Sequence, residues 1–228
     1  MTSPTLPDLL SWLRARLGDA ELFRTGRDPG RVQHLALALE PGDLPPRLPA
    51  AAGALFLHRA FRLGAAHPGL PVLASHDGFD AALTTGVNRA LADRLGWTAL
   101  EEVTGPKGAR GLIATPPEQS WDALLHALDA ELGGHDFARA PSPQAGLKVA
   151  LMNAMRPELM DLARQHGAGV YLTGELRRGA LARAGELGVG VVALGHGRTE
   201  LWGLRHLAGE LEAAFPGLEA QAYAGALQ

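Results

Sequence analysis

Between residues 147 and 215, short apolar runs alternate with segments of helical periodicity, and this alternation constrains the fold more than any other feature of the sequence. The predicted order is strand 147–152, helix 157–167, strand 170–175, helix 177–188, strand 189–196 and helix 199–215. Strands that alternate with helices need crossover connections, which build a parallel sheet covered by helices. The pattern therefore predicts an α/β fold.

The first half of the chain gives shorter signals of the same kind. Leucines at helical spacing, followed by Gly18, predict a helix from Leu6 to Leu17. Turn residues bound the apolar runs of three predicted strands, at 32–39, 53–57 and 70–75. Two further helices, at 87–95 with Thr85 available as its cap and at 118–132, and a last short strand near 218–225 are also predicted.

The segment between Thr104 and Pro117 is dense in glycine and proline, which fits either a domain connection or a long loop. A chain of 228 residues is long enough for two small domains. We therefore expect an N-terminal α/β domain at 1–106 and a C-terminal α/β domain at 107–228. The predicted fold class is α/β, with two layered domains whose largely parallel sheets are covered by helices.

Composition excludes several classes of function. The formal net charge of -3 gives no general attraction for nucleic acid or an anionic membrane, so neither is an expected partner. With no cysteine, thiol nucleophiles and sulfur ligands are excluded, and any metal must bind nitrogen and oxygen. The N-terminus does not resemble a signal peptide, and no apolar run reaches the roughly 18 residues of a membrane span. The expected compartment is the cytoplasm.

Two imidazole-carboxylate pairs with the same spacing carry the strongest functional signal. His76 and Asp80, in SHDGFD, and His196 and Glu200, in GHGRTE, each follow a predicted buried strand. Ligands of open parallel sheets bind at the carboxyl ends of strands, where His58 also falls. Imidazole and carboxylate suit a borderline divalent ion, but each pair is also explained by helix capping, by complementing a helix dipole or by loop hydrogen bonds.

Four motifs in a fixed order resemble the NIF-three-like family, whose members are often called GTP cyclohydrolase 1 type 2 homologues. They are FLHR at 56–59, HDGFD at 76–80 followed by GVN at 86–88, TGE at 173–175 and GHGRTE at 195–200. The resemblance implies a two-domain subunit with a pair of divalent metals in the cleft between its domains, within a homohexameric ring. It implies five metal ligands: His58, His76, Asp80, His196 and Glu200. The expected cofactor is zinc, manganese or iron, with one or two ions per subunit.

The sequence departs from the family pattern at several places. Leu57 replaces the first histidine of a His-His pair and provides no lone pair, and Arg178 stands where many members have histidine. A Gly-rich turn after residue 152 and an Asp-Asn-x-Gly-Leu stretch near the N-terminus are also missing. Three histidines and two carboxylates suffice for one ion, so a mononuclear site is the preferred expectation. Asp77 and His67 are alternatives for the missing donor.

Arginines near the same motifs suggest an anionic substrate. Arg59, Arg178 and Arg198 are candidate substrate-binding residues because guanidinium groups match phosphate and carboxylate geometry, although solvated surface positions explain them equally well. Glu200 and Glu175 are candidate catalytic residues, while Glu175 could instead orient a ligand or simply end a strand.

We therefore expect a metal-dependent hydrolase acting on a small anionic or nucleotide-like substrate. The alternative is a non-catalytic, ring-forming scaffold or regulator whose metal site is structural or degenerate, and Leu57 and Arg178 favour it.

Overall fold

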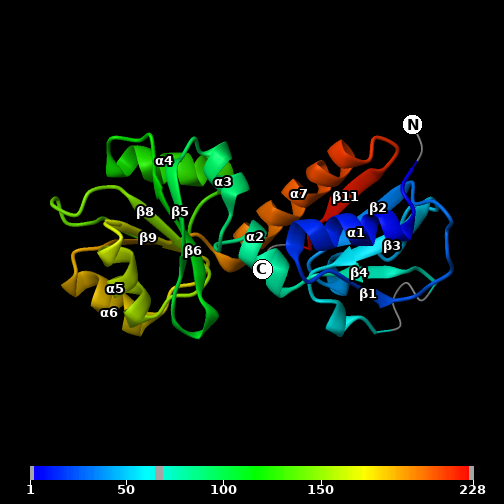
Figure 1. Ribbon diagram of the computed structural model, residues 1–228, viewed down its shortest axis with the longest axis horizontal. Coiled ribbons are helices and arrows are strands. Elements are labelled where there is room, and N and C mark those ends of the chain that lie inside the picture. Colours follow the sequence, from blue (N-terminus) through cyan, green and yellow to red (C-terminus); the bar gives the residue numbers. More distant parts are fainter. Residues whose placement is uncertain (1–2, 65–68, 226–228) are drawn as a thin grey trace. The chain divides into compact units, whose positions relative to one another are not determined.

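The structure, a computed structural model, describes residues 3–64 and 69–225 (Figure 1). The chain forms two compact units, and the first is assembled from two stretches, Met1–Phe79 and Gly203–Gln228, with Asp80–Trp202 as the second unit between them. The chain passes between the units within two helices, α2 (Asp77–Leu83) and α7 (His196–Ala214).

The first unit is built on a five-stranded sheet in the order β1-β4-β3-β2-β11. Its elements, besides parts of α2 and α7, are α1 (Leu6–Leu17), β1 (Glu21–Arg24), β2 (His34–Ala38), β3 (Ala52–Leu57), β4 (Val72–Ala74), β11 (Glu219–Tyr223) and the 3-10 turns η1 (Pro41–Asp43) and η2 (Ala60–Arg62). The pairings of β4, β3, β2 and β11 are parallel, and β1 joins the edge antiparallel. The predicted last strand is confirmed as β11, and it pairs with β2 near the start of the chain.

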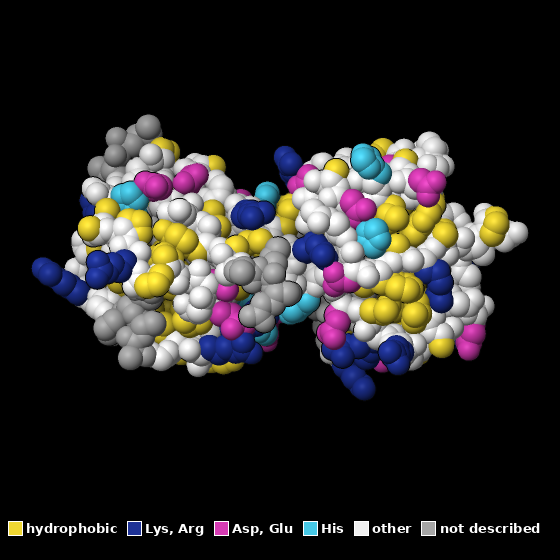
Figure 2. Space-filling model, turned by 180° about the vertical axis from the view of Figure 1, so that it is seen from behind, with side chains coloured by type: hydrophobic (Ala, Val, Ile, Leu, Met, Phe, Trp, Pro, Cys, Tyr) yellow, Lys and Arg dark blue, Asp and Glu magenta, His cyan; other side chains and the backbone are white. Residues whose placement is uncertain are grey.

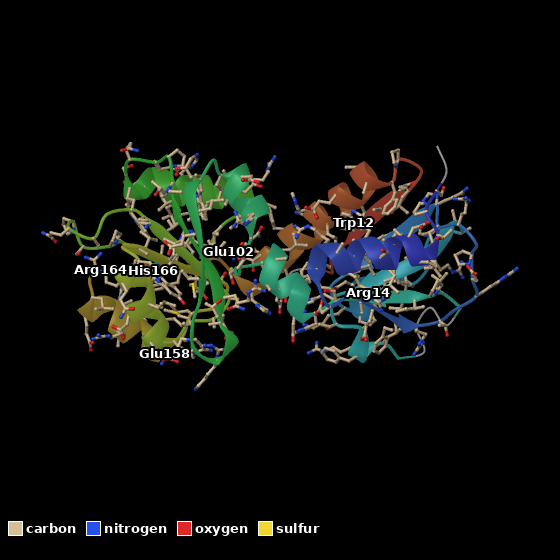
Figure 3. All side chains as sticks on the ribbon, in the orientation of Figure 1. Trp12, Arg14, Glu102, Glu158, Arg164 and His166 are labelled. Atoms are coloured by element: carbon tan, nitrogen blue, oxygen red, sulfur yellow. The ribbon has the colours of Figure 1, made fainter. Side chains whose placement is uncertain are left out.

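The two faces of this sheet are covered differently. Helix α1 begins at a capping box made by Thr5 and Asp8 and buries its leucines at helical spacing, while Trp12 meets Phe215 edge to face at 6.3 Å (Figure 3). The opposite face carries a buried cluster centred on β2, β3 and β4, which the irregular segments holding Leu44 and Leu63 help to cover. The segment that holds Leu63 follows the carboxyl end of β3.

An ion pair joins α1 to the later part of α7 within the first unit. Arg16 donates to both carboxylate oxygens of Glu210, with its Nε 2.8 Å from Oε2, and His206 Nε2 lies 3.2 Å from Oε1. Partial burial acts to raise the pKa of Glu210, but hydrogen bonds from His206 and Arg16 outweigh burial and hold that pKa below its ordinary value. The carboxyl group of Glu210 therefore loses its proton at a lower pH in the folded protein than in the unfolded chain.

The second unit contains a six-stranded mixed sheet in the order β5-β6-β8-β9-β10-β7. Its elements, besides parts of α2 and α7, are α3 (Arg89–Arg94), β5 (Thr98–Thr104), η3 (Pro106–Gly108), β6 (Arg110–Thr115), α4 (Trp121–Leu132), β7 (Phe137–Arg139), β8 (Val149–Met152), α5 (Pro157–Gln165), β9 (Val170–Thr173), α6 (Arg178–Glu186) and β10 (Gly190–Ala193). The central strands β8, β9 and β10 are parallel, whereas β5, β6 and β7 are antiparallel to their neighbours.

Helices cover both faces of this sheet, so every residue of β8, β9 and β10 is buried. Because side chains alternate along a strand, Tyr171 packs on one face with α5 and α6, and its neighbour Leu172 packs on the other with α3 and α4 (Figure 1). Burial of both faces explains why these strands appear in the sequence as continuous apolar runs. The predicted α/β class, with two sheets covered by helices, is confirmed.

The structure differs from the sequence predictions between residues 98 and 115. This segment is an antiparallel hairpin of β5 and β6, with the register Val103↔Gly111, and the boundary expected between 106 and 107 falls in its turn. Strand β5 lies at the sheet edge and exposes Glu101 and Glu102, so it lacks an apolar alternation (Figure 3). Helix α3 is capped by Asn88 instead of Thr85.

The surface is of mixed character. On the face drawn in Figure 2, basic and acidic side chains are scattered among hydrophobic ones. Within residues 3–64 and 69–225, none of the helices combines the length and the apolar composition that crossing a bilayer requires.

The pairing of Glu210 predicts a loss of stability on the acid side. Because its pKa is lower in the folded state, its contribution is complete above the ordinary glutamate pKa of about 4.3 and disappears as the pH falls through the folded value. We expect Glu210→Gln to lower the free energy of unfolding by about 1 kcal/mol at pH 7, with a smaller difference from the parent protein at pH 3. Urea unfolding at a series of pH values measures this, with exposed Glu21→Gln as the matched control.

Candidate functional site

The parallel register of β3 and β4 brings two of the predicted histidines together. Leu57 pairs with Ala74, so His58 leaves β3 at the same sheet edge where the chain runs from β4 through Ser75 to His76. The imidazole rings of His58 and His76 stack with their centroids 4.6 Å apart and an interplanar angle of 16°. His58 is buried and His76 is exposed, so the pair extends from the interior to the surface.

Helix α2 adds a carboxylate to this pair. The helix begins directly after His76 and is continuous through the division between the units, so it places Asp80 one turn beyond His76. One ligand atom from each of His58, His76 and Asp80 lies within 4.8 Å of the others. Divalent ions of the zinc type hold nitrogen and oxygen ligands at about 2.0–2.2 Å, so the ligand atoms of a tetrahedral site lie about 3.3–3.6 Å from one another. The cluster therefore has to contract by at most about 1.5 Å to hold one such ion.

A single aspartate fixes the start of α2. Asp19 accepts a hydrogen bond from Gly78 N at 2.8 Å and a short one from the Ser75 hydroxyl. The backbone is close here as well, because a Cβ atom on Gly78 would lie 2.1 Å from the carbonyl oxygen of Leu17. Asp19 and Gly78 thus hold the turn that carries His76 toward Asp80.

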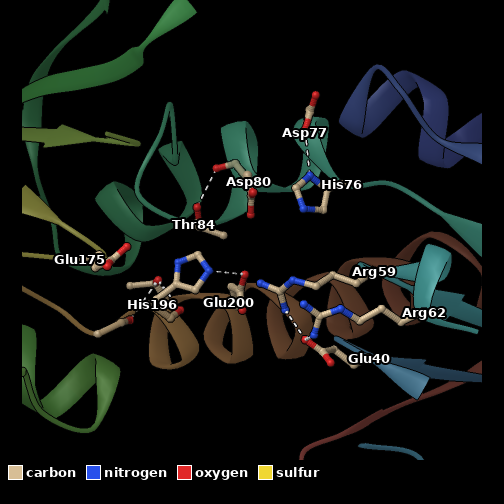
Figure 4. A network of polar contacts seen from close by, with 12 residues as sticks. Glu40, Arg59, Arg62, His76, Asp77, Asp80, Thr84, Glu175, His196 and Glu200 are labelled. Carbon is tan, nitrogen blue, oxygen red and sulfur yellow. Dashed lines mark hydrogen bonds and ion pairs between the residues drawn. The ribbon is translucent and has the colours of Figure 1, made fainter. Parts of the chain in front are cut away.

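Asp77, predicted as an alternative ligand, contacts His76 instead. Its Oδ1 lies 2.8 Å from His76 Nδ1, and 95% of the Asp77 side chain is exposed (Figure 4). A proton on Nδ1 leaves the lone pair of the ring on Nε2, so this contact sets the tautomer that a metal ligand needs. Asp77 therefore fits an orienting role.

The second predicted pair lies at the start of α7. Gly195, with φ 93°, makes the turn between β10 and α7, so the helix begins at His196, three residues earlier than the sequence indicated. His196 Nε2 and Glu200 Oε1 are 3.0 Å apart, and the two residues are four positions apart on the helix (Figure 4). Glu200 is 2% exposed, whereas 60% of the His196 side chain is exposed.

Glu175 belongs to the loop that follows β9, the parallel neighbour of β10. Gly195 N donates to the carbonyl of Gly174, so this loop and the start of α7 are adjacent. The Glu175 side chain is exposed and pairs with Arg177 at 2.7 Å. Its neighbour Arg178 begins α6 and is also exposed.

The other arginines form two separate groups. Arg59, which precedes η2, and Arg62, the last residue of η2, both donate to Oε1 of Glu40, at 3.3 and 2.5 Å. Arg198 donates to Asp136 at 2.6 Å and to the carbonyl of Leu194, so it fastens the start of α7 to the loop before β7.

The five predicted ligands therefore lie in one three-residue cluster, His58, His76 and Asp80, and one pair, His196 and Glu200. The convergence of all five on one site stays a prediction. Leu57 is fully buried in the apolar cluster of the first sheet, and His67 lies outside the described residues. Asp19 and Glu40 were missed because their partners are distant along the chain and no local motif marks them.

Known proteins resemble this chain in sequence and in fold. The sequence model of the family described as Duf34/NIF3 (NGG1p interacting factor 3) matches residues 60–224. Two curated relatives, both named GTP cyclohydrolase 1 type 2 homolog, come from Neisseria meningitidis serogroup A (strain Z2491) and serogroup B (strain MC58). Each is 29% identical over 144 residues, which is 63% of this chain and 57% of the relative. The match thus spans little more than half the length of these relatives.

Solved structures show the same fold over nearly the whole chain. TTHA1606 from Thermus thermophilus has a TM-score of 0.71 at 20% identity, covering 97% of this chain and 98% of that one. A Bacillus cereus protein related to NIF3 also has a TM-score of 0.71, at 16% identity, covering 100% of this chain and 98% of that one.

The contacts of Asp19 predict an indirect effect on metal binding. Asp19→Ala removes the acceptor that holds Gly78 N and the Ser75 hydroxyl, which we expect to lower the free energy of unfolding by about 1 kcal/mol and Zn²⁺ affinity by about tenfold. Titration calorimetry and thermal unfolding measure the two effects. Asp28→Ala is the control, because Asp28 also accepts from a backbone N–H, that of Gly30, in an exposed loop. Equal Zn²⁺ affinity in both variants would contradict the positioning role.

Proposed function

This chain belongs to the Duf34/NIF3 (NGG1p interacting factor 3) family, and from that premise we propose that it is a metal-dependent hydrolase of a small anionic or nucleotide-like substrate. The observation that carries the proposal is the cluster of His58, His76 and Asp80, whose ligand atoms lie within 4.8 Å of one another. In the proposal, His196 and Glu200 complete the ligand set.

The donor set determines which ions fit. Imidazole nitrogen and carboxylate oxygen without sulfur suit zinc, manganese and iron in their divalent forms. We propose one ion per subunit, because Leu57 occupies a ligand position of the family pattern and its buried side chain has no donor atom. A second ion would need another donor.

The chain's own residues have distinct parts in the proposed reaction. A bound divalent cation supplies Lewis acidity and lowers the pKa of a water molecule toward neutrality. In the proposal, Glu200, which is buried and paired with His196, accepts a proton, and Glu175 is a second acceptor in the exposed loop after β9. Arg59, Arg178 and Arg198 are the proposed contacts for the negative charge of the substrate. Arg59 and Arg198 are already paired, with Glu40 and Asp136, but each guanidinium has further N–H donors for a substrate.

Metal content tests the proposal most directly. We expect purified protein supplied with zinc, manganese or iron to retain close to one equivalent of metal, and His76→Ala to lose most of it, because one of three clustered donors is removed. Elemental analysis measures this. His34→Ala is the matched control, since His34 begins β2 in the same unit and pairs with Glu219. Full metal retention by His76→Ala would contradict the assignment.

The convergence of the two histidine pairs has its own test. If His196 and Glu200 share the ion, His196→Ala should lower Zn²⁺ affinity by at least about tenfold while leaving the fold intact. Titration calorimetry measures the affinity, and circular dichroism reports the fold. An unchanged affinity would restrict the site to the cluster of His58, His76 and Asp80.

An activity assay distinguishes the hydrolase from the alternative, a scaffold or regulator with a structural or degenerate metal site. The missing donor at Leu57 favours this alternative. Phosphoesters and nucleotides assayed with Mn²⁺ or Zn²⁺ should be hydrolysed, and a chelator should abolish hydrolysis. Activity that persists in the presence of a chelator would refute the mechanism. If the protein binds no metal, the scaffold or regulator is the hypothesis that remains.

We also propose that the protein is a cytoplasmic homohexamer. Light scattering of the purified protein measures the mass of the assembly and so tests the number of subunits.

A further inference from the structure

An exposed aromatic side chain lies next to the candidate metal cluster. Phe61 and Phe23 are the two large hydrophobic side chains that are exposed within residues 3–64 and 69–225, and Phe61 is the more exposed of the two at 65%. Phe61 lies in η2, three residues beyond His58. An exposed phenylalanine ring leaves apolar surface that a ligand can bury favourably.

The ring of Phe61 has two polar neighbours. Its centroid lies 6.3 Å from that of His76, at an interplanar angle of 57°, and the Arg62 guanidinium carbon lies 5.6 Å from the ring centre. His76 in turn stacks on His58. A series of rings therefore runs from the buried histidine of the cluster to the surface, and it ends at Phe61 beside a cation.

The cation beside Phe61 is fixed in place. Arg62 donates to Glu40 at 2.5 Å, and Arg59 donates to the same oxygen, so two guanidinium groups share one carboxylate (Figure 4). Those three side chains together carry one net positive charge. More than half of the Arg62 side chain is exposed, and a guanidinium presents five N–H donors, so Arg62 can contact a ligand while it remains bound to Glu40.

We propose that Phe61 and Arg62 form a subsite for the base and the charged group of a nucleotide-like ligand beside His58, His76 and Asp80. A planar base stacks on the exposed phenylalanine ring, and a phosphate or other negative group pairs with Arg62. This inference rests on the proposed function and deepens it, because it selects substrates that combine an aromatic ring with negative charge over simple phosphoesters.

Binding of two probes to the zinc-supplied full chain tests the subsite. GMP has a base, whereas ribose 5-phosphate has the same sugar and phosphate without one. We expect the protein to bind GMP at least about tenfold more tightly than ribose 5-phosphate, a ratio equivalent to about 1.4 kcal/mol. Phe61→Leu, which keeps apolar volume but removes the ring, should weaken GMP binding about tenfold and leave ribose 5-phosphate unchanged. Phe61→Trp should retain GMP binding, and Phe23→Leu is the matched control.

Several outcomes would overturn the inference. Equal affinity for the two probes would exclude a base subsite, and so would GMP binding that is the same in Phe61→Leu and the parent protein. If Phe61→Leu changes the assembly mass in light scattering but not the GMP affinity, Phe61 is a subunit contact. Elemental analysis of the same samples distinguishes a failure of the metal site from a failure of the subsite. If the samples contain no metal but GMP binding still depends on Phe61, the metal site is refuted and the subsite is retained.

Discussion

The parallel pairing of β3 with β4 is the interaction on which the candidate site depends. Backbone hydrogen bonds fix which residues leave the two strands at the same level, and they place His58 beside the segment that leads to His76. A register shift of one residue would move every side chain of a strand to the opposite face. The same register therefore determines both the stacking of the histidines and the burial of Leu57. Helix α2 then needs only one turn to bring Asp80 to the histidines.

The parts of the fold that were predictable from sequence are those with buried, continuous patterns. Strands β8, β9 and β10 are covered on both faces, so their apolar runs are uninterrupted, and the intervening helices alternate with them. The histidines were identifiable because each lies at or just beyond the end of a buried strand: His58 directly follows β3, His76 lies two positions beyond β4, and His196 lies three positions beyond β10. Position at a strand end is a local property, and a sequence displays it directly.

What the sequence did not reveal depends on contacts between distant segments. Strand β5 is exposed at an edge, β1 alternates exposed and half-buried residues, and β7 is half-buried throughout, so none has a distinctive apolar pattern. Asp19 acts on a turn 56 to 59 positions away, and Glu40 acts on arginines 19 and 22 positions away. Phe61 has no unusual sequence context either, and its significance appears only with its exposure and its neighbours.

The discontinuity of the first unit has a consequence for the order of folding. Strand β11 pairs with β2 across more than 180 residues of chain, and the whole second unit lies between them. During synthesis the ribosome therefore exposes β2 with one edge uncovered long before its partner emerges, while the second unit already has all of its strands. Contacts so distant form slowly, so the sheet that carries the histidine cluster is expected to close last, after the inserted unit is folded.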